Sequence, residues 1–299
     1  MMLFKNRIFI NFILITCHVK NFVKSQTRVV GGQNVSDREF PYIVSIRYRN
    51  VHICGGTIVS NRYILSAAHC LIRYKLYILY VITYVQLYVI ILGHFRNIII
   101  CNFFSSIIII IIIIIIIIII NFSRISPFLF TIVAGITSLH ETGSVYFVQF
   151  PIVHTFNIET RSNDIVLLRT TQKILFNYKV QPVRLTYIDI NADRYPVTMI
   201  GWGKFEYNGP ISEHLQKIHL SILDHHKCMR EWKYVNNGHI CISTGIGRGS
   251  CVGDSGGPIL ANHYQIGIIS FGQLCAVGKP DVTTKVFHYL DWINSYILY

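Results

Sequence analysis

Short runs of β-branched and aromatic residues, each bounded by glycine, asparagine or proline, recur along the chain from about residue 40 onward. Runs of this length and composition predict β-strands. The expected strands are Tyr42–Tyr48, Cys54–Val59, Tyr63–Ser66, Phe130–Ala134, Val145–Val153, Ile165–Arg169, Thr198–Gly201, Gln216–Ser221, Pro258–Ala261, Tyr264–Phe271 and Asp281–Val286. Many short strands joined by tight turns, with almost no helical periodicity, indicate an all-β protein built from barrels.

Two apolar patterns differ from this strand pattern. Val286, Leu290, Ile293 and Ile297 fall at helical spacing and predict a C-terminal helix. Near the N-terminus, a run of apolar residues at 8–15 follows two basic side chains and is too short to span a bilayer. We expect residues 1–25 to be a signal peptide, with no clear cleavage site, and the protein to be secreted and extracellular.

The formal net charge of +13 over 299 residues raises the possibility of a nucleic-acid or membrane-surface partner. Nine basic residues and no acidic ones lie in segments 1–28 and 71–127. The remaining chain carries 18 basic residues (27 minus 9) against 14 acidic ones, a net charge of about +4. Because the excess charge lies largely outside the main body of the chain, neither partner is expected.

The sequence contains thirteen histidines and eight cysteines, but they are scattered. No Cys-x-x-Cys pair or Cys/His cluster has the spacing of zinc ligands. The loop Leu139–Gly143 offers one carboxylate where a calcium site needs several. We therefore expect no metal and no cofactor.

Candidate chemistry centres on the glycine-dense segment Gly249–Pro258. Gly253, Gly256 and Gly257 allow backbone conformations that could aim N–H groups at one point beside the Ser255 hydroxyl. A serine nucleophile also needs a base and a group that orients this base. His69, in Ser66-Ala-Ala-His-Cys70, and Asp164, before an apolar strand, are candidates for these roles.

Five motifs occur in one order along the chain: Val29-Val-Gly-Gly32, Ala67-Ala-His-Cys70, Asp164-Ile-Val-Leu-Leu168, Gly201-Trp-Gly203 and Gly253-Asp-Ser-Gly-Gly-Pro258. Together they resemble the trypsin/chymotrypsin family of serine peptidases, particularly its invertebrate chymotrypsin-like and collagenase-like members. The resemblance implies two six-stranded antiparallel β-barrels, with the C-terminal helix packed on the second. It also implies a secreted endopeptidase that acts on proteins or peptides as a monomer.

The same resemblance assigns the catalytic roles. Ser255 would attack the scissile carbonyl, His69 would take and return the proton, and Asp164 would orient His69 and stabilise its imidazolium. The N–H groups of Gly253 and Ser255 would form the oxyanion hole. The alternative is a non-catalytic homologue that acts as a binding or regulatory protein, but such homologues typically lose the serine or the histidine.

By resemblance, six cysteines pair as Cys54–Cys70, Cys228–Cys241 and Cys251–Cys275, which implies an oxidising compartment. The implied pairing leaves Cys17 and Cys101 without a partner, and both lie in segments that we expect to be absent from the working protein.

The segment around Arg28 resembles an activation site. Cleavage after Arg28 by another protease would free the Val29 amine, which would pair with the buried Asp254. An unpaired carboxylate in that position would cost several kcal/mol. We therefore expect an inactive precursor with a short activation peptide, residues 26–28, followed by a peptidase domain at 29–299.

The resemblance places the substrate-binding residues at Gly249, Ser250, Ser270, Gly272 and Asp281. Gly249 stands where a trypsin has aspartate, and Asp281 stands where the family usually has glycine. We expect chymotrypsin-like cleavage with secondary tolerance of Arg or Lys. In the alternative interpretation, Asp281 turns away and accepts hydrogen bonds from backbone N–H groups.

The segment of chain between His69 and Asp164 is unusually long, with 94 residues. It contains fourteen consecutive isoleucines at 107–120. The surplus runs over about 71–130. A transmembrane helix would have to leave and rejoin one barrel, and a surface loop of this hydrophobicity would promote aggregation. Homopolymeric isoleucine with abundant Tyr, Leu, Phe and Asn is what AT-rich noncoding DNA encodes when translated. We favour a translated intron.

Overall fold

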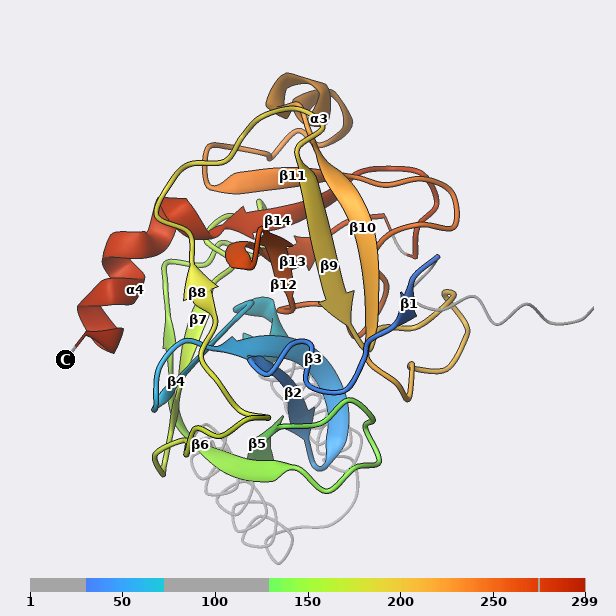
Figure 1. Cartoon of the computed structure of the whole chain (residues 1–299). Coiled ribbons are helices and arrows are strands. Elements are labelled where there is room, and N and C mark those ends of the chain that lie inside the picture. The colour runs from blue at the N-terminus through green and yellow to red at the C-terminus, as the bar shows by residue number, and fades with distance from the viewer. Residues whose placement is uncertain (1–30, 73–128, 274, 299) are drawn as a thin grey trace, which may run out of the picture.

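The computed structural model describes residues 31–72, 129–273 and 275–298, which form two barrels stacked in one body (Figure 1). The strands of the first barrel are β2 (Ile43–Tyr48), β3 (Val51–Ile58), β4 (Tyr63–Ser66), β5 (Phe130–Ala134), β6 (Ser144–Val153) and β7 (Val166–Thr170). They close in the order β2-β3-β4-β7-β6-β5, and every neighbouring pair is antiparallel.

The strands of the second barrel are β9 (Pro196–Gly201), β10 (Gln216–Leu223), β11 (His239–Ser243), β12 (Pro258–Ala261), β13 (Tyr264–Phe271) and β14 (Asp281–Lys285). The order β9-β10-β11-β14-β13-β12 closes through pairs of β9 with β10 and with β12. Two short strands join this sheet: β1 (Gln33–Asn34) pairs with β10, and β8 (Arg184–Leu185) pairs with β13. The expected fold class is confirmed.

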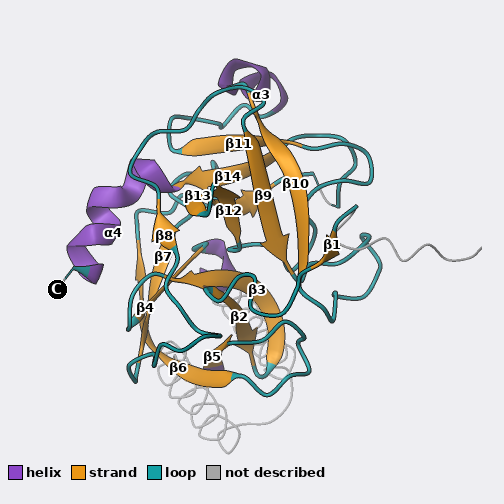
Figure 2. Ribbon diagram, viewed as in Figure 1, coloured by secondary structure: helices purple, strands orange, loops and turns teal. Residues whose placement is uncertain are grey.

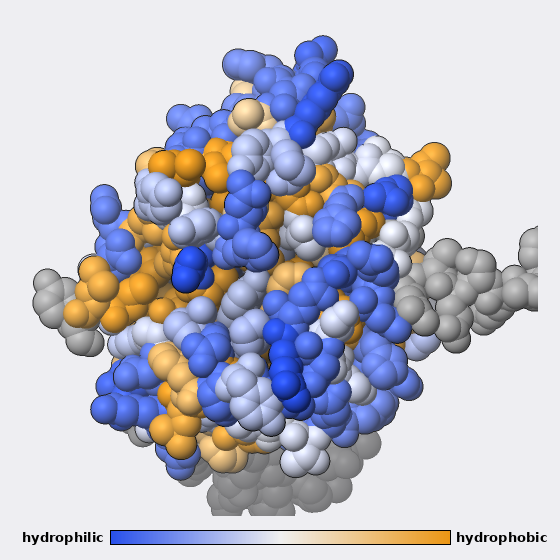
Figure 3. Space-filling model, viewed as in Figure 1, coloured by the Kyte–Doolittle hydropathy of each residue, from blue (hydrophilic) through white to orange (hydrophobic). Residues whose placement is uncertain are grey.

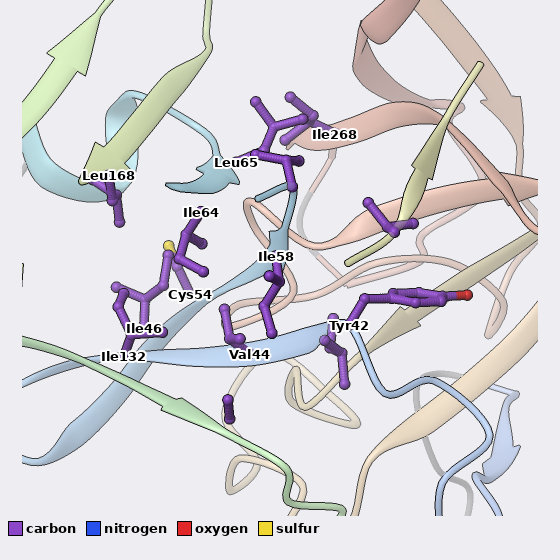
Figure 4. Close-up of a cluster of buried hydrophobic side chains, with 14 of the residues drawn as sticks. Tyr42, Val44, Ile46, Cys54, Ile58, Ile64, Leu65, Ile132, Leu168 and Ile268 are labelled. Carbon is purple, nitrogen blue, oxygen red and sulfur yellow. The ribbon is translucent and has the colours of Figure 1, made fainter. Parts of the chain in front are cut away.

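Alternation of side chains sets the register of the strands. In β6, Tyr146 and Val148 are buried while their neighbours Val145 and Phe147 are exposed. A shift of one residue would expose the buried pair, so the hydrophobic pattern fixes the pairing with β5 and β7. Figure 4 shows how apolar side chains of the first barrel fill its interior, among them Val44, Ile46 and Ile132.

The short strands β1 and β8 and two further elements beside or within the second barrel were not expected from the sequence. Helix α3 (His225–Glu231) is too short for a periodic pattern, and its N-terminal cap is Asp224, whose side chain accepts a hydrogen bond from the Lys227 N–H at 3.0 Å. Strand β11 contains only two β-branched residues, Ile240 and Ile242, and is largely buried between β10 and β14. Pairing with these two neighbours completes the barrel at a segment too short to stand out in the sequence.

The chain ends in a 3-10 turn, η2 (Val286–Tyr289), and helix α4 (Leu290–Ile297), as expected (Figure 2). The expectation that this end packs on the second barrel was incomplete. The η2 turn contacts β13, but the rings of Tyr289 and Trp292 contact His154, which follows β6 of the first barrel. The C-terminal segment 286–297 thus contacts both barrels, and Figure 3 shows apolar side chains gathered on the outer surface of α4.

Three disulfides are present in the pairings that the resemblance implies: Cys54–Cys70, Cys228–Cys241 and Cys251–Cys275. The first ties β3 to the helical turn that contains His69, and the third ties the segment before Ser255 to the segment after β13. These two disulfides therefore brace segments that carry candidate functional residues, whereas Cys228–Cys241 ties helix 225–231 to strand 239–243.

Several expectations lie outside the described residues. They concern the signal peptide, Arg28, Val29, Cys17, Cys101 and most of the surplus segment. All six strands of the first barrel lie on either side of residues 73–128, because β4 ends at Ser66 and β5 begins at Phe130. Within the described ranges, no helix is long and apolar enough to cross a membrane.

Candidate active site

The three candidate catalytic residues come from both barrels. His69 lies just after β4 and Asp164 just before β7, whereas Ser255 lies just before β12 of the second barrel. His69 and Ser255 line one cleft of about 670 Å³, and Asp164 is fully buried behind His69. Closure of the two barrels therefore brings together residues that are as much as 186 positions apart (255 minus 69).

Asp164 holds His69 through two separate atoms. One carboxylate oxygen of Asp164 accepts a hydrogen bond from the His69 backbone N–H at 2.8 Å, and the other lies 2.6 Å from His69 Nδ1. The Ser270 hydroxyl also donates to this second oxygen, and the Thr284 hydroxyl donates to the Asp164 backbone carbonyl at 2.8 Å. These contacts fix both the orientation of the imidazole and the tautomer with a proton on Nδ1.

Burial by itself would raise the pKa of Asp164, because it disfavours the charged form. Its charge interaction with His69 and the hydrogen bonds from His69 and Ser270 outweigh burial and hold the pKa below its usual value. Asp164 is therefore an ionised, fully buried carboxylate next to the imidazole. It can stabilise a positive charge that forms on His69.

The backbone of Ser255 is anchored to the first barrel. The Gly55 N–H donates to the Ser255 carbonyl at 2.8 Å, and the Ser66 hydroxyl donates to the Gly55 carbonyl at 2.9 Å. Gly256 has φ +78°, and a Cβ at this position would overlap the Ser66 hydroxyl. The glycine after the serine is therefore required by a close approach between the two barrels.

The N–H groups of Gly253 and Ser255 donate no hydrogen bond to any acceptor within the described part of the chain. Gly253 has φ +103°, which a side chain would disfavour. The His52 Nε2 atom lies 3.0 Å from the Gly253 carbonyl, and His52 Nδ1 lies 2.8 Å from the Ser45 hydroxyl. This buried chain of contacts positions the peptide that follows Gly253.

Sequence reasoning missed His52 and Ser45, because it treated histidines other than His69 as ordinary. Burial lowers the pKa of His52 to about 4, so its ring is neutral at physiological pH. A neutral ring can donate from Nε2 to the Gly253 carbonyl and accept at Nδ1 from Ser45. No local motif marks this role, since the two ends of the contact are 201 residues apart.

Asp254 is buried next to the two glycines of Gly201-Trp-Gly203. Its carboxylate accepts hydrogen bonds from the Gly203 N–H at 2.7 Å and the Cys251 N–H at 2.9 Å. A Cβ at Gly201 or at Gly203 would overlap this carboxylate, which explains why glycine flanks the tryptophan. Burial raises the pKa of Asp254 to about 7, and the described residues supply no cation to pair with it.

The predicted substrate-binding residues fall into two groups. Ser250, Ser270 and Gly272 line the cleft, whereas Gly249 and Asp281 are not among its described lining residues. Asp281 is 1% exposed and accepts a hydrogen bond from the Ser250 N–H at 2.7 Å. A Cβ at Gly272 would overlap the other carboxylate oxygen of Asp281, so this oxygen lies directly behind the cleft wall. Burial raises the pKa of Asp281 to about 6.

One group of potential metal ligands occurs among the described residues: Cys54, His69 and Cys70. Both sulfur atoms belong to a disulfide, and His69 is held by Asp164. Oxidised cysteines lack the thiolate that a metal binds, so this group does not offer a metal-binding set of donors.

Comparison with known proteins identifies a matching family, similar proteins and a similar solved structure. The family model described as Trypsin matches residues 29–85 and 130–293. Chymotrypsin-2 from Vespa crabro is 34% identical over 268 residues, which cover 89% of this chain and 99% of that protein. Venom serine protease 34 from Apis mellifera is 32% identical, over 91% of this chain and 59% of that protein. The solved structure of human heparin binding protein shares the fold, with a TM-score of 0.65 and 20% identity over 90% of this chain and 97% of that one.

Proposed function

Because the chain belongs to the trypsin family of serine endopeptidases, we propose that it is a secreted peptidase, made as an inactive precursor, that cleaves mainly after aromatic side chains and leucine. The observation that carries the proposal is that His69 and Ser255 line one cleft while the buried Asp164 contacts His69 Nδ1. An N-terminal segment with signal-peptide character and three disulfides support secretion.

The geometry supports acyl transfer in two steps. The Ser255 hydroxyl oxygen bonds to the substrate carbonyl carbon while its proton moves to His69 Nε2. The N–H groups of Gly253 and Ser255 receive the negative charge on the carbonyl oxygen. Breakdown expels the amine, which takes the proton from His69, and water repeats the sequence on the acyl-enzyme. A non-catalytic binding protein on this fold is the alternative, and the intact set of three residues argues against it.

Asp254 supports control by cleavage after Arg28. A buried carboxylate with a raised pKa needs a cation, and the amine of Val29 would supply one after cleavage. Because the next residue is Ser255 and the preceding one is Gly253, pairing at Asp254 would set the backbone of both oxyanion donors. In this proposal the precursor is inactive because the loop lacks its ion pair.

We expect an Arg28→Gln precursor to remain at the activity of the uncut protein after treatment with trypsin. The parent should gain activity at the same rate at which Val29 becomes the N-terminal residue. N-terminal sequencing and a peptide assay on the same samples measure both. Full activity of uncut Arg28→Gln would contradict the proposal.

The pH dependence of stability gives an independent check. The folded pKa of Asp254 is about 7, above its ordinary value of 3.8. The folded protein therefore keeps its full stability below about pH 4, where Asp254 is protonated in both the folded and the unfolded state. It loses stability as the pH rises to about 7, because the buried carboxyl resists ionisation. The uncut protein should lose up to a few kcal/mol of stability over this range. The cut protein should lose less, because the amine stabilises the charged form. Thermal unfolding of the uncut protein and of uncut Asp254→Asn at several pH values tests this, and the difference between the two curves isolates Asp254. Asp281, whose pKa is raised, and His52, whose lowered pKa gives a slope of opposite sign, titrate in both proteins.

For specificity, the cleft walls beside Ser250 and Gly272 favour apolar side chains, whose burial contributes about 1.5–3 kcal/mol each. Asp281 adds a negative charge behind Gly272, and one of its oxygens is already used by the Ser250 N–H. A substrate cation would therefore reach Asp281 through water, which gives a weaker preference than a direct bidentate pair.

We expect Asp281→Asn to reduce kcat/KM for peptides with Arg or Lys before the cleaved bond and to spare those with Phe or Leu. Asparagine can still accept from the Ser250 N–H, so this variant removes charge without removing the hydrogen bond. Asp281→Gly should show the same pattern. Equal losses on all four peptides would mean that Asp281 has a structural role alone.

We also propose that residues 71–130 include a segment absent from the native protein, because the first barrel closes without residues 73–128. Replacing 73–128 by a linker of about six residues, a common loop length, should give a folded and activatable protein. Sequencing the transcript between the codons of Cys70 and Thr131 tests the proposal directly. A transcript that retains the isoleucine codons would contradict it.

A further inference from the structure

The cleft is nearly free of formal charge. Among its described lining residues, Arg161 is the one Lys, Arg, Asp or Glu side chain. Phe156 and Ile158 of the same loop line the cleft with it, as does His69. A cation at the edge of an apolar cleft attracts anions more strongly than one on an open surface, because less water screens it.

The backbone of Arg161 is held in place from several sides. Asn157 accepts hydrogen bonds from the N–H groups of Glu159 and Thr160, both at 2.9 Å, and donates its own N–H to the Ser162 carbonyl at 3.0 Å. Asn236 of the second barrel donates to the Ser162 hydroxyl at 3.1 Å. The ring of His239 bonds to the backbone of Arg161. The loop is thus fixed before any substrate binds.

The guanidinium of Arg161, in contrast, has no ion pair within the described ranges, although eight other pairs occur there. Glu159 is two residues away and does not pair with it. The side chain is exposed, so its charge is available to a molecule in the cleft.

We propose that Arg161 selects an acidic side chain on the amino side of the cleaved bond, at the second or fourth residue from that bond. The side chain before the bond enters the space between Ser250 and Gly272. In an extended substrate, successive side chains point in opposite directions. Ser250 and Gly272 belong to the second barrel, whereas Arg161 belongs to a loop of the first barrel. The second and fourth residues would therefore face Arg161, and the first and third would not. The inference rests on the peptidase function proposed above and adds a substrate class to it.

The experiment uses the cut protein and peptides with Phe before the bond. At each of the second, third and fourth positions, Glu is compared with the isosteric Gln. In the parent, we expect Glu to raise kcat/KM by about three- to tenfold at the second or fourth position, the range for a charge-assisted pair at a partly exposed site. The ratio should fall to about one in Arg161→Gln and should decrease in the parent as salt is added.

Two variants serve as controls. Arg161→Lys keeps the charge but loses the planar fork, so it should keep part of the Glu preference. Arg194 is another exposed arginine with a left-handed backbone (φ +62°, compared with +58° for Arg161), but it does not line the cleft. Arg194→Gln should therefore show the same Glu/Gln ratio as the parent. Normal cleavage of the Gln peptides by Arg161→Gln would show that the variant is folded.

Three results would overturn the inference. They are a Glu/Gln ratio of about one in a parent that cleaves the Gln peptides, a ratio that survives in Arg161→Gln, and a preference confined to the third position. Failure of the parent to cleave any of the peptides would instead overturn the proposed peptidase function.

Discussion

Ser255→Ala should lower kcat by about 10⁶-fold in the cut protein, because the members of such a triad act as a unit. The change removes the oxygen that bonds to the substrate carbonyl carbon. It leaves the backbone contact from the Gly55 N–H to the Ser255 carbonyl intact, so the loop should keep its position. Thermal unfolding should therefore be nearly unchanged. Active-site titration and labelling by an organophosphonate measure the loss.

A matched control is Ser295→Ala, which removes an exposed hydroxyl from α4, away from the cleft. This variant should be labelled and should turn over substrate as the parent does. If Ser255→Ala kept more than a small fraction of the parent's activity, another residue would have to be the nucleophile.

Asp164→Asn should lower kcat by about 10⁴-fold, the loss that this change causes in the Ser-His-Asp template of the family. The His69 backbone N–H needs an acceptor, so the asparagine oxygen should take the place of the oxygen that now lies 2.8 Å from it. The asparagine NH₂ then faces His69 Nδ1. Because this NH₂ is a donor, Nδ1 must be unprotonated and Nε2 must carry the proton, which prevents it from acting as the base.

Ser270→Ala tests the support that Asp164 receives from the second barrel, without changing the charge of Asp164. It removes a hydrogen bond to Asp164 but leaves both contacts with His69, so the loss in kcat should be far smaller than for Asp164→Asn. The measurement is kcat as a function of pH, together with a thermal unfolding curve. Equal losses in the two variants would mean that Asp164 acts through local packing and not through the tautomer of His69.

The sequence determined the elements that depend on local patterns. Alternating apolar residues identified the strands of the two barrels, and the spacing of Val286 and Ile293 identified the C-terminal helix. Local signals also marked His69, Asp164 and Ser255, because each lies in a short motif. Helix α3 and strand β11 were missed, since the first is shorter than two helical turns and the second is set by its neighbours in the sheet.

The tertiary structure decided how distant residues meet. The contact of His52 with Gly253, the bond from Ser270 to Asp164 and the place of Asp281 behind Gly272 all join segments that local patterns describe separately. The role proposed for Arg161 depends on the cleft, which residues of both barrels line. The physical reason is that side-chain periodicity encodes which face of a strand is buried, whereas contacts across the cleft depend on the register and closure of both barrels, which no single segment specifies.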